Sequence, residues 1–453
     1  MIVARKISGR YGLLRRGVRV ALLFLYLIVP WLNWGDRPMI LLDIASRKFY
    51  FPGAVFWPQE FYFLWFVVAT LGLSLFLFTS LFGRMWCGWA CPQTVYTELF
   101  DAIGRVVSGR FGKASQSTGE KILVHSVWVL TSAVLTFHFI GYFVGVRAMF
   151  AALSADGLAV FTNAVWPYFW LAATGLFYFD LGIFRHNFCV YLCPYARFQS
   201  VMLDRDSYVV AYDSHRGEPR RKAKTLRPEE EAKWGDCTGC TKCVQVCPTG
   251  IDIREGLQVA CINCTHCVDA CTDEMARFGK QTLVGFNSLN YFEERRKPRL
   301  IRPRTVTYAA LLLTVVTGFT VALAARSPLQ VSVVRDRNLP PILLQYRAQN
   351  YYNVDVINMR ERPVEVFLSV EPIDPGEKRI AGLTQIVGEN PMRLAPGEHR
   401  PIRVIVQAEP DASHISGVRE NVPVRFVLQE QAASVESGAA GRVGKNSIFT
   451  VPE

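Results

Sequence analysis

Eight of the twelve cysteines stand in two short runs, and their spacing predicts a redox cofactor. Each run reads C-x-x-C-x-x-C-x-x-x-C, a ligand pattern of [4Fe–4S] clusters, in which three close thiolates hold one cluster and the fourth reaches the other. On that logic one cluster takes Cys237, Cys240, Cys243 and Cys271, and the other takes Cys247, Cys261, Cys264 and Cys267. A zinc site, which usually draws four ligands from two separated pairs, fits this array poorly, as does a disulfide framework. We therefore expect the chain to transfer electrons.

The pattern is that of a bacterial ferredoxin with two clusters, and it departs from the usual form at one position. Pro248 follows Cys247, whereas Thr272 rather than proline follows Cys271. Proline at that position shapes the turn and removes an N–H near the sulfur. We interpret the threonine as a tolerated change.

The remaining four cysteines form two C-x-x-x-C-P motifs, Cys87 with Cys91 and Cys189 with Cys193. Residues four apart share one helix face, so each pair is expected on one face, with the following proline ending or kinking the helix. Four thiolates could bind copper, because soft ligands prefer Cu(I). They could also cycle between dithiol and disulfide, or simply pack as small apolar side chains. The spacing alone leaves the three alternatives open.

The composition predicts a membrane protein with water-exposed parts. The 453 residues are 51% hydrophobic and 13% aromatic, and the mean hydropathy is positive. A bilayer crossing needs about 20 apolar residues. Five windows come close to that length: Val18–Trp34, Phe61–Phe82, Ile122–Val144, Leu158–Phe179 and Thr305–Ala324. The net charge of +12 does not indicate nucleic acid, because the basic residues gather on one side of the implied membrane.

The charge distribution predicts a topology with the N-terminus and both cysteine-rich loops in the cytoplasm and the C-terminus outside. The loops Arg84–Lys121 and Arg185–Arg304 are rich in lysine and arginine, as cytoplasmic loops are. The Gly35–Glu60 loop faces out but carries three basic residues, so it fits least well. All exported segments lack cysteine, which agrees with reduced thiols on the cytoplasmic side.

The sequence indicates a multi-domain membrane protein with an α-helical transmembrane region, a two-cluster ferredoxin-like insert and a C-terminal all-β immunoglobulin-like sandwich. Residues 1–203 form a membrane domain with four helices, in which each half ends in one C-x-x-x-C-P motif as a parallel duplication. Residues 204–304 hold a charged tether and the ferredoxin domain, and residues 305–326 form a fifth helix. Residues 327–453 alternate apolar and polar positions between turn signals, which is typical of antiparallel strands in a sandwich.

Histidines at the membrane boundary are further candidates. His125 and His138 lie within the third apolar window, where we expect each to be hydrogen-bonded to a neighbouring helix. We interpret His186 and His266 as bystanders rather than metal ligands. No G-x-G-x-x-G or P-loop motif occurs, so no nucleotide cofactor is implied and the electron donor is left open.

The order of these motifs resembles the FixG/RdxA/CcoG family, accessory proteins for assembly of cbb(3)-type cytochrome c oxidase in the bacterial inner membrane. The resemblance spans nearly the whole chain, from the duplicated C-x-x-x-C-P motifs through the two-cluster ferredoxin to the periplasmic immunoglobulin-like tail. It implies two [4Fe–4S] clusters on the eight cysteines named above. It further implies a cupric reductase that converts Cu(II) to Cu(I), with candidate copper or redox roles for Cys87, Cys91, Cys189 and Cys193.

The implied partners are the lipid bilayer and copper chaperones or oxidase assembly factors. Two other functions compete with this one. An electron-transfer subunit of a quinol-oxidising respiratory system would share both motif types, and a non-catalytic scaffold would use its clusters only for folding. The exported β-sandwich and the lack of any C-x-x-C-H haem motif favour the assembly role.

Overall fold

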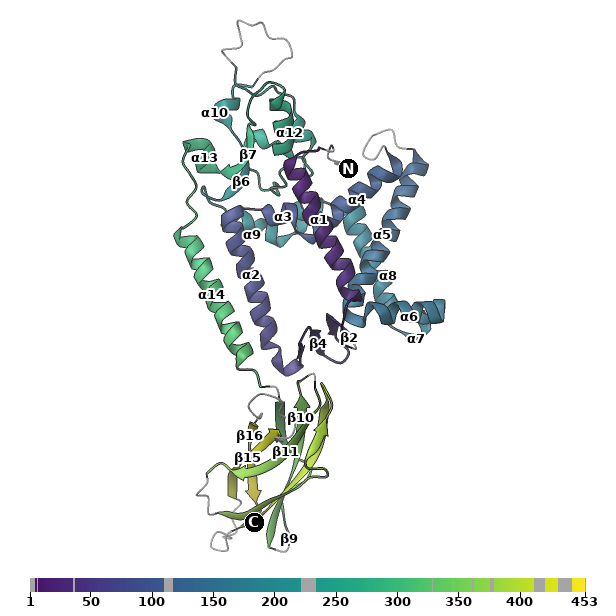
Figure 1. Ribbon diagram of the computed structural model, residues 1–453, viewed down its shortest axis with the longest axis vertical. Coiled ribbons are helices and arrows are strands. Elements are labelled where there is room, and N and C mark those ends of the chain that lie inside the picture. The colour runs from purple at the N-terminus through teal and green to yellow at the C-terminus, as the bar shows by residue number, and fades with distance from the viewer. Residues whose placement is uncertain are drawn as a thin grey trace. The chain divides into compact units, whose positions relative to one another are not determined.

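The computed structural model describes residues 5, 7–35, 37–109, 117–220, 234–327, 329–344, 346–360, 362–374, 379–410, 420–430 and 442–452 (Figure 1). The chain divides into two compact units. One comprises Met1–Ile44 with Phe61–Phe319, and the other comprises Ala45–Glu60 with Thr320–Glu453. Residues 221–233 of the charged tether lie outside the described residues, whereas its first part includes a strand, Tyr208–Tyr212.

Three helices of the first unit are long and apolar enough to cross a membrane: α2 (Tyr62–Phe82), α5 (Thr118–Val144) and α14 (Pro303–Ala324). Their bounds lie within four residues of the expected windows. A ring of Phe319 in α14 packs against Phe63 and Phe66 of α2, with centroids 5.9 and 5.8 Å apart. Helices α2 and α14 therefore lie side by side, as Figure 1 also shows.

The fourth expected crossing is bent. Helices α6 (Val146–Asp156) and α7 (Val160–Asn163) precede α8 (Trp166–Phe177) and a π-helical extension, η4 (Tyr178–Phe184). The two halves meet at an angle of 92°, so only the second half runs along α5. Pro167 begins α8, and proline is favoured in the first turn of a helix because its missing N–H would have no partner there.

The first expected crossing differs most from the structure. Helix α1 (Arg10–Ile28) begins eight residues before the apolar window and carries four arginines, so it is not among the helices that are apolar enough to span. Arg15 of this helix is buried, where it pairs with Glu98 of α4 (Pro92–Ser108). The backbone N–H of Gly12 donates to Asp269 at 2.7 Å. The arginine-rich start of α1 is thus packed against protein.

The ferredoxin region is built on one antiparallel pair, β6 (Tyr208–Tyr212) with β7 (Val284–Ser288), and on helices α11 (Lys242–Gln245) and α12 (His266–Ala276). Its core contains Val210, Ile253, Val268 and Leu283 together with several of the cysteines. The cysteine loops therefore supply part of the core themselves.

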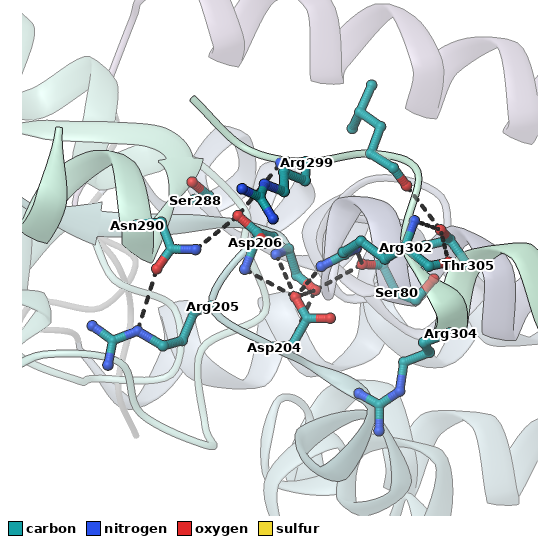
Figure 2. A network of polar contacts seen from close by, with 12 residues as sticks. Ser80, Asp204, Arg205, Asp206, Ser288, Asn290, Arg299, Arg302, Arg304 and Thr305 are labelled. Carbon is teal, nitrogen blue, oxygen red and sulfur yellow. Dashed lines mark hydrogen bonds and ion pairs between the residues drawn. The ribbon is translucent and has the colours of Figure 1, made fainter. Parts of the chain in front are cut away.

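A polar network ties the ferredoxin region to the membrane helices (Figure 2). Arg302, just before α14, forms an ion pair with Asp204 and donates to the carbonyl of Ser80 in α2 at 2.7 Å. Asn290 of α13 (Leu289–Glu294) donates to Asp206 at 2.7 Å. Partly buried charged groups with several hydrogen bonds favour one geometry. The base of the ferredoxin region is therefore fixed to α2 and α14.

The second unit contains two antiparallel sheets, as expected for an immunoglobulin-like sandwich. One sheet has the order β12-β14-β10-β8, with β9 also paired to β10, and the other has the order β13-β11-β15-β16. The strands are β8 (Leu329–Arg335), β9 (Ile342–Leu344), β10 (Arg347–Asn358), β11 (Val364–Pro372), β12 (Ile380–Ile386), β13 (Met392–Leu394), β14 (His399–Pro410), β15 (Glu420–Glu430) and β16 (Arg442–Val451). Tyr352 and Phe426, with ring centroids 4.9 Å apart, join the two sheets through the core.

A hairpin from the loop between α1 and α2 also belongs to the second unit. It consists of β4 (Lys48–Phe51) and β5 (Ala54–Phe56). Arg326 forms a salt bridge with the buried Glu60, with 2.6 Å between Nε and Oε1, and Lys48 lies over the ring of Trp57 at 4.1 Å. The sequence predicts this hairpin as part of the membrane domain, residues 1–203. It instead packs with the strands that follow α14, and its basic residue Lys48 is held by protein contacts.

Candidate functional site: two cysteine-lined cavities and a thiol cluster

The eight cysteines of the ferredoxin region line two cavities. The first holds about 380 Å³ of empty space and is bordered by Cys237, Cys240, Cys243 and Cys271. The second holds about 340 Å³ and is bordered by Cys247, Cys261, Cys264 and Cys267, with Cys243 at its edge. These two groups are the same two sets of four that the spacing predicts. The assignment of each cysteine to a cluster remains a prediction, and the arrangement fits it.

The two cysteine loops have matching backbones. Gly239 and Asn263, each two residues after the first cysteine of a run, have φ of 69° and 51°. Thr241 and Thr265, two positions further on, have φ of 57° and 63°. Non-glycine residues rarely adopt this left-handed region, so its recurrence at equal positions marks a shared local requirement. Successive turns of this kind direct backbone N–H groups to one concave side, where an anionic group can lie.

The chemistry of these thiols also fits a metal cluster. Burial raises the pKa of Cys243 and of Cys261 to about 12, so both would stay protonated without a positive partner. Coordination to a metal deprotonates a thiol outright. Among the described residues, no three histidine, cysteine or acidic side chains converge closely enough to hold one ion. Four thiolates spread around a cavity suit a cubane better than a single zinc ion.

The two cavities differ in exposure and charge. Cys240 at the first is exposed, whereas Cys261 and Cys264 at the second are buried. The buried Arg15 donates from Nη1 to the carbonyl of Cys264 at 2.9 Å. A nearby positive charge and lower solvent exposure both change the potential of a cluster, the charge by favouring its reduced form. The second cavity also lies nearer the membrane helices.

The C-x-x-x-C-P motifs differ locally from the expected helix faces. Cys87 lies in the short helix α3 (Met85–Trp89), but Cys91 has an extended backbone, because Pro92 is the first residue of α4. The second motif repeats this break. Cys189 lies in the π-helical segment η5 (Phe188–Leu192), and Cys193 immediately precedes Pro194, which begins α9 (Pro194–Met202). A residue before proline is forced away from the helical region, so the second cysteine of each pair lies between two helices.

The internal repeat is preserved in the backbone. Gly83 and Arg185, each four residues before the first cysteine of a motif, both have a φ near 56° (57° and 56°). The halves are also joined to each other. Gln199 accepts hydrogen bonds from Arg84 Nε at 3.0 Å and from Cys87 Sγ at 3.2 Å, and Gln93 donates to the carbonyl of Arg185 at 3.3 Å. Residues of one motif thus position the other.

The four membrane thiols lie near one another. Burial raises the pKa of Cys189 to about 12, and the neighbouring thiols Cys91, Cys87 and Cys193 add to the increase. In the part of the chain that the structure describes, no three of them converge on one point. A copper ion held by more than two of these thiolates would therefore need them to move closer together.

The first membrane motif contacts the second cysteine cavity directly. A Cβ on Gly88 would lie 2.4 Å from the carbonyl oxygen of Ile262 and 2.8 Å from the Cα of Cys264. Cys87, Ile262 and Cys264 form one buried cluster, and Arg84 donates to the carbonyl of Val259. The backbone between Cys87 and Cys91 thus lies against the loop of a predicted cluster ligand. The first membrane motif and this cysteine loop are therefore in van der Waals contact.

Sequence reasoning missed three residues that build this region: Gly88, Gln199 and Arg15. Gly88 could have been noticed in the sequence, because a glycine follows the first cysteine of the first motif, whereas Val190 occupies the matching position of the second. The roles of Gln199 and Arg15 could not be read from the sequence, because the hydrogen-bond partners Arg84 and Cys264 lie more than a hundred residues away.

Three family models match this chain. A 4Fe-4S dicluster domain matches residues 184–289, and a 4Fe-4S binding domain matches residues 63–113 and 162–205, which contain the duplicated C-x-x-x-C-P motifs. The IG-like fold at the C-terminal of FixG matches residues 319–452. The matches confirm the expected fold class.

Curated relatives match over most of their length. Protein RdxA of Cereibacter sphaeroides is 33% identical and covers 98% of this chain and 96% of its own. Protein RdxB of the same organism is 37% identical over 82% of this chain and 81% of its own. The nitrogen fixation protein FixG of Rhizobium meliloti is 32% identical over 89% and 86%.

Proposed function

The chain belongs to the FixG/RdxA family of iron–sulfur electron-transfer proteins, and from that premise we propose that it reduces Cu(II) to Cu(I) for assembly of a cbb(3)-type cytochrome c oxidase. One observation carries the proposal. The backbone at Gly88, between the two thiols of the first membrane motif, lies against the loop of Cys264. A continuous route therefore runs from the cysteine-lined cavities to four soft ligands.

The membrane thiols have the chemistry that such a reaction needs. When bound, the [4Fe–4S] clusters would supply single electrons, which suits a one-electron copper couple. Burial raises the pKa of Cys87 to about 11, so this thiol binds copper only by losing its proton. Thiolates prefer Cu(I) over Cu(II), so ligation of copper favours the reduced product. Gln199, which accepts the hydrogen bond of the Cys87 thiol at 3.2 Å, holds the sulfur in place before copper arrives.

We propose that the protein lies in the bacterial inner membrane, with the N-terminus and ferredoxin region in the cytoplasm and the β-sandwich in the periplasm. Two observations support this topology. The arginine-rich start of α1 packs on α12 of the ferredoxin region, where Asp269 accepts from the N–H of Gly12. The hairpin that precedes α2 belongs to the same compact unit as the strands after α14. Copper chaperones or oxidase assembly factors are the partners that we propose.

An electron-transfer subunit of a quinol-oxidising system is the second candidate. The match of residues 63–113 and 162–205 to a 4Fe-4S binding domain favours it, since it places the membrane motifs among iron–sulfur proteins without reference to copper. A non-catalytic scaffold is the third. Copper chemistry separates the three.

The test is anaerobic reduction of Cu(II) by purified protein with a Cu(I)-specific chelator as readout. The variants replace both cysteines of one membrane motif by serine, which removes soft ligands at nearly constant volume. One variant changes Cys87 and Cys91, and the other changes Cys189 and Cys193. These variants should keep their iron and sulfide but lose Cu(I) binding and most of the reductase activity.

The contrasting control is Cys264→Ser, which should lower the iron content and stop reduction together. Membrane-cysteine variants that bind and reduce copper like the parent would show that these cysteines only pack. A parent protein that oxidises quinol but leaves Cu(II) unreduced would support the respiratory subunit instead.

A further inference from the structure

A cavity at the inner end of the membrane helices is not used by the function proposed above. It holds about 1040 Å³ of empty space, part of it open to solvent. Its walls are His125 of α5, residues 182–187, Val190 and the Pro248–Thr249 turn of the ferredoxin region. It therefore lies where a membrane helix, the second C-x-x-x-C-P repeat and a cysteine loop meet.

A buried histidine in the cavity wall has a ring nitrogen without a hydrogen-bond partner. His186 is only 7% exposed, and its Nδ1 has no partner among the described residues. A buried polar atom without a partner is costly, and in native proteins it usually has a reason. His125, by contrast, already shares a hydrogen bond of 3.0 Å with the hydroxyl of Tyr178. In the tautomer that carries its hydrogen on Nε2, the neutral imidazole accepts a hydrogen bond at Nδ1.

The cavity borders exposed apolar side chains of the bent span. Ile183, which lines the cavity, is 52% exposed, and Phe179, one turn earlier on the same segment, is 53% exposed. The two lie at the end of the bent span Val146–Asn163 with Trp166–Phe184. Large apolar side chains that are exposed on a proposed membrane span are expected to face lipid. The cavity thus suits a ligand with a polar head and an apolar tail that enters from the bilayer.

The inner wall connects the cavity to the second cysteine set. Thr249 borders both this cavity and the one lined by Cys247, Cys261, Cys264 and Cys267. Its Oγ1 lies 3.3 Å from the sulfur of Cys247. A single residue therefore separates a bound molecule from a predicted cluster ligand. A ligand in this position is placed to exchange electrons.

We propose that this cavity is the electron-entry site and that it binds an isoprenoid quinol. The inference rests on the proposed function, because it names the donor for the same electron route. One quinol hydroxyl would donate to Nδ1 of His186 once the imidazole turns toward the cavity, and the isoprenoid tail would lie along Ile183. Both O–H bonds break and both C–O bonds become carbonyls. The two electrons leave one at a time past Thr249 to the two clusters, and the two protons leave to cytoplasmic water.

The test uses the full chain in nanodiscs with its clusters intact and decylubiquinol as the probe. Under anaerobic conditions, decylubiquinol should bleach the visible absorbance of the parent clusters. Two variants should slow that bleaching at least tenfold: Ile183→Trp, which fills the mouth, and His186→Leu, which removes the hydrogen-bond acceptor. Phe179→Trp is the matched control, because it adds bulk one turn away without lining the cavity, and it should behave like the parent.

Dithionite separates this inference from the proposed function. It should reduce the clusters of all variants at the parent rate, and each pre-reduced protein, freed of excess dithionite, should reduce Cu(II) like the parent. The quinol site is refuted if decylubiquinol leaves the parent clusters oxidised while dithionite reduces them, or if the two cavity variants react with quinol like the parent. A pre-reduced, dithionite-free parent protein that leaves Cu(II) unreduced would instead overturn the proposed function.

Discussion

The contact at Gly88 permits a sharp test by the substitution Gly88→Ala. The added Cβ would lie 2.4 Å from the carbonyl oxygen of Ile262 and 2.8 Å from the Cα of Cys264. Both are backbone atoms, which cannot rotate away as a side chain can. Overpacking of this kind typically costs about 1–3 kcal/mol, and the backbone neighbours favour the upper end. Alanine regains up to ~1 kcal/mol of helix propensity in α3.

The net cost is therefore about 2 kcal/mol, which corresponds to a roughly 30-fold shift away from the docked arrangement. We expect electron transfer from pre-reduced clusters to Cu(II), followed by anaerobic stopped flow, to slow by about 10- to 30-fold on that energy scale. The iron and sulfide content should remain unchanged, since none of the eight ferredoxin cysteines is altered.

The matched control is Gly17→Ala in α1, where an added Cβ meets nothing within 4 Å. It should gain helix propensity without overlap and keep the parent rate. A Gly88→Ala protein that has parent stability and transfers electrons to copper at the parent rate would refute the reasoning. In that case electrons would reach copper without crossing this contact.

Three further outcomes are expected. Anaerobic analysis of purified protein should find about eight iron and eight sulfide per chain, and a fully active preparation containing only zinc would contradict the cluster prediction. An export-dependent reporter should be active when fused after Glu453 and silent near Arg220, while the reverse pattern would refute the topology. Arg326→Met should destabilise the second unit by about 3 kcal/mol in chemical unfolding, because it leaves the buried Glu60 unpaired. Parent stability in that variant would show that Glu60 is neutralised in another way.

Local features of the sequence determined the chemistry and most of the elements. The two runs of cysteines predicted two sets of four, because cluster ligation depends on residues a few positions apart. Apolar length predicted α2, α5 and α14 within four residues, since a bilayer sets the length of a crossing helix. Turn signals and alternation predicted the sandwich, but not its strands β9, β12 and β13. Strands β9 and β13 have three residues each, which carry too little pattern, and β12 lacks a regular alternation.

The helix breaks at the membrane motifs were only half predictable. The proline after each second cysteine predicted a helix break. In the structure this proline also begins the next helix, and Cys91 and Cys193 before it have an extended backbone. The π-helical turn at Cys189 had no signal in the sequence. A π-turn shifts the hydrogen-bond ladder by one residue, and it persists where the surrounding structure supports it, often at functional sites.

Only the tertiary structure decided which distant segments meet. It placed Gly88 against Cys264, buried Arg15 beside the same loop, and brought the hairpin of β4 and β5 into the C-terminal unit. It also drew His186 and Thr249 to one cavity. The sequence by itself determined what each segment can do, because ligand type, apolar length and turn chemistry act over a few residues. The meeting of segments depends on complementary surfaces formed after folding, which no local pattern encodes.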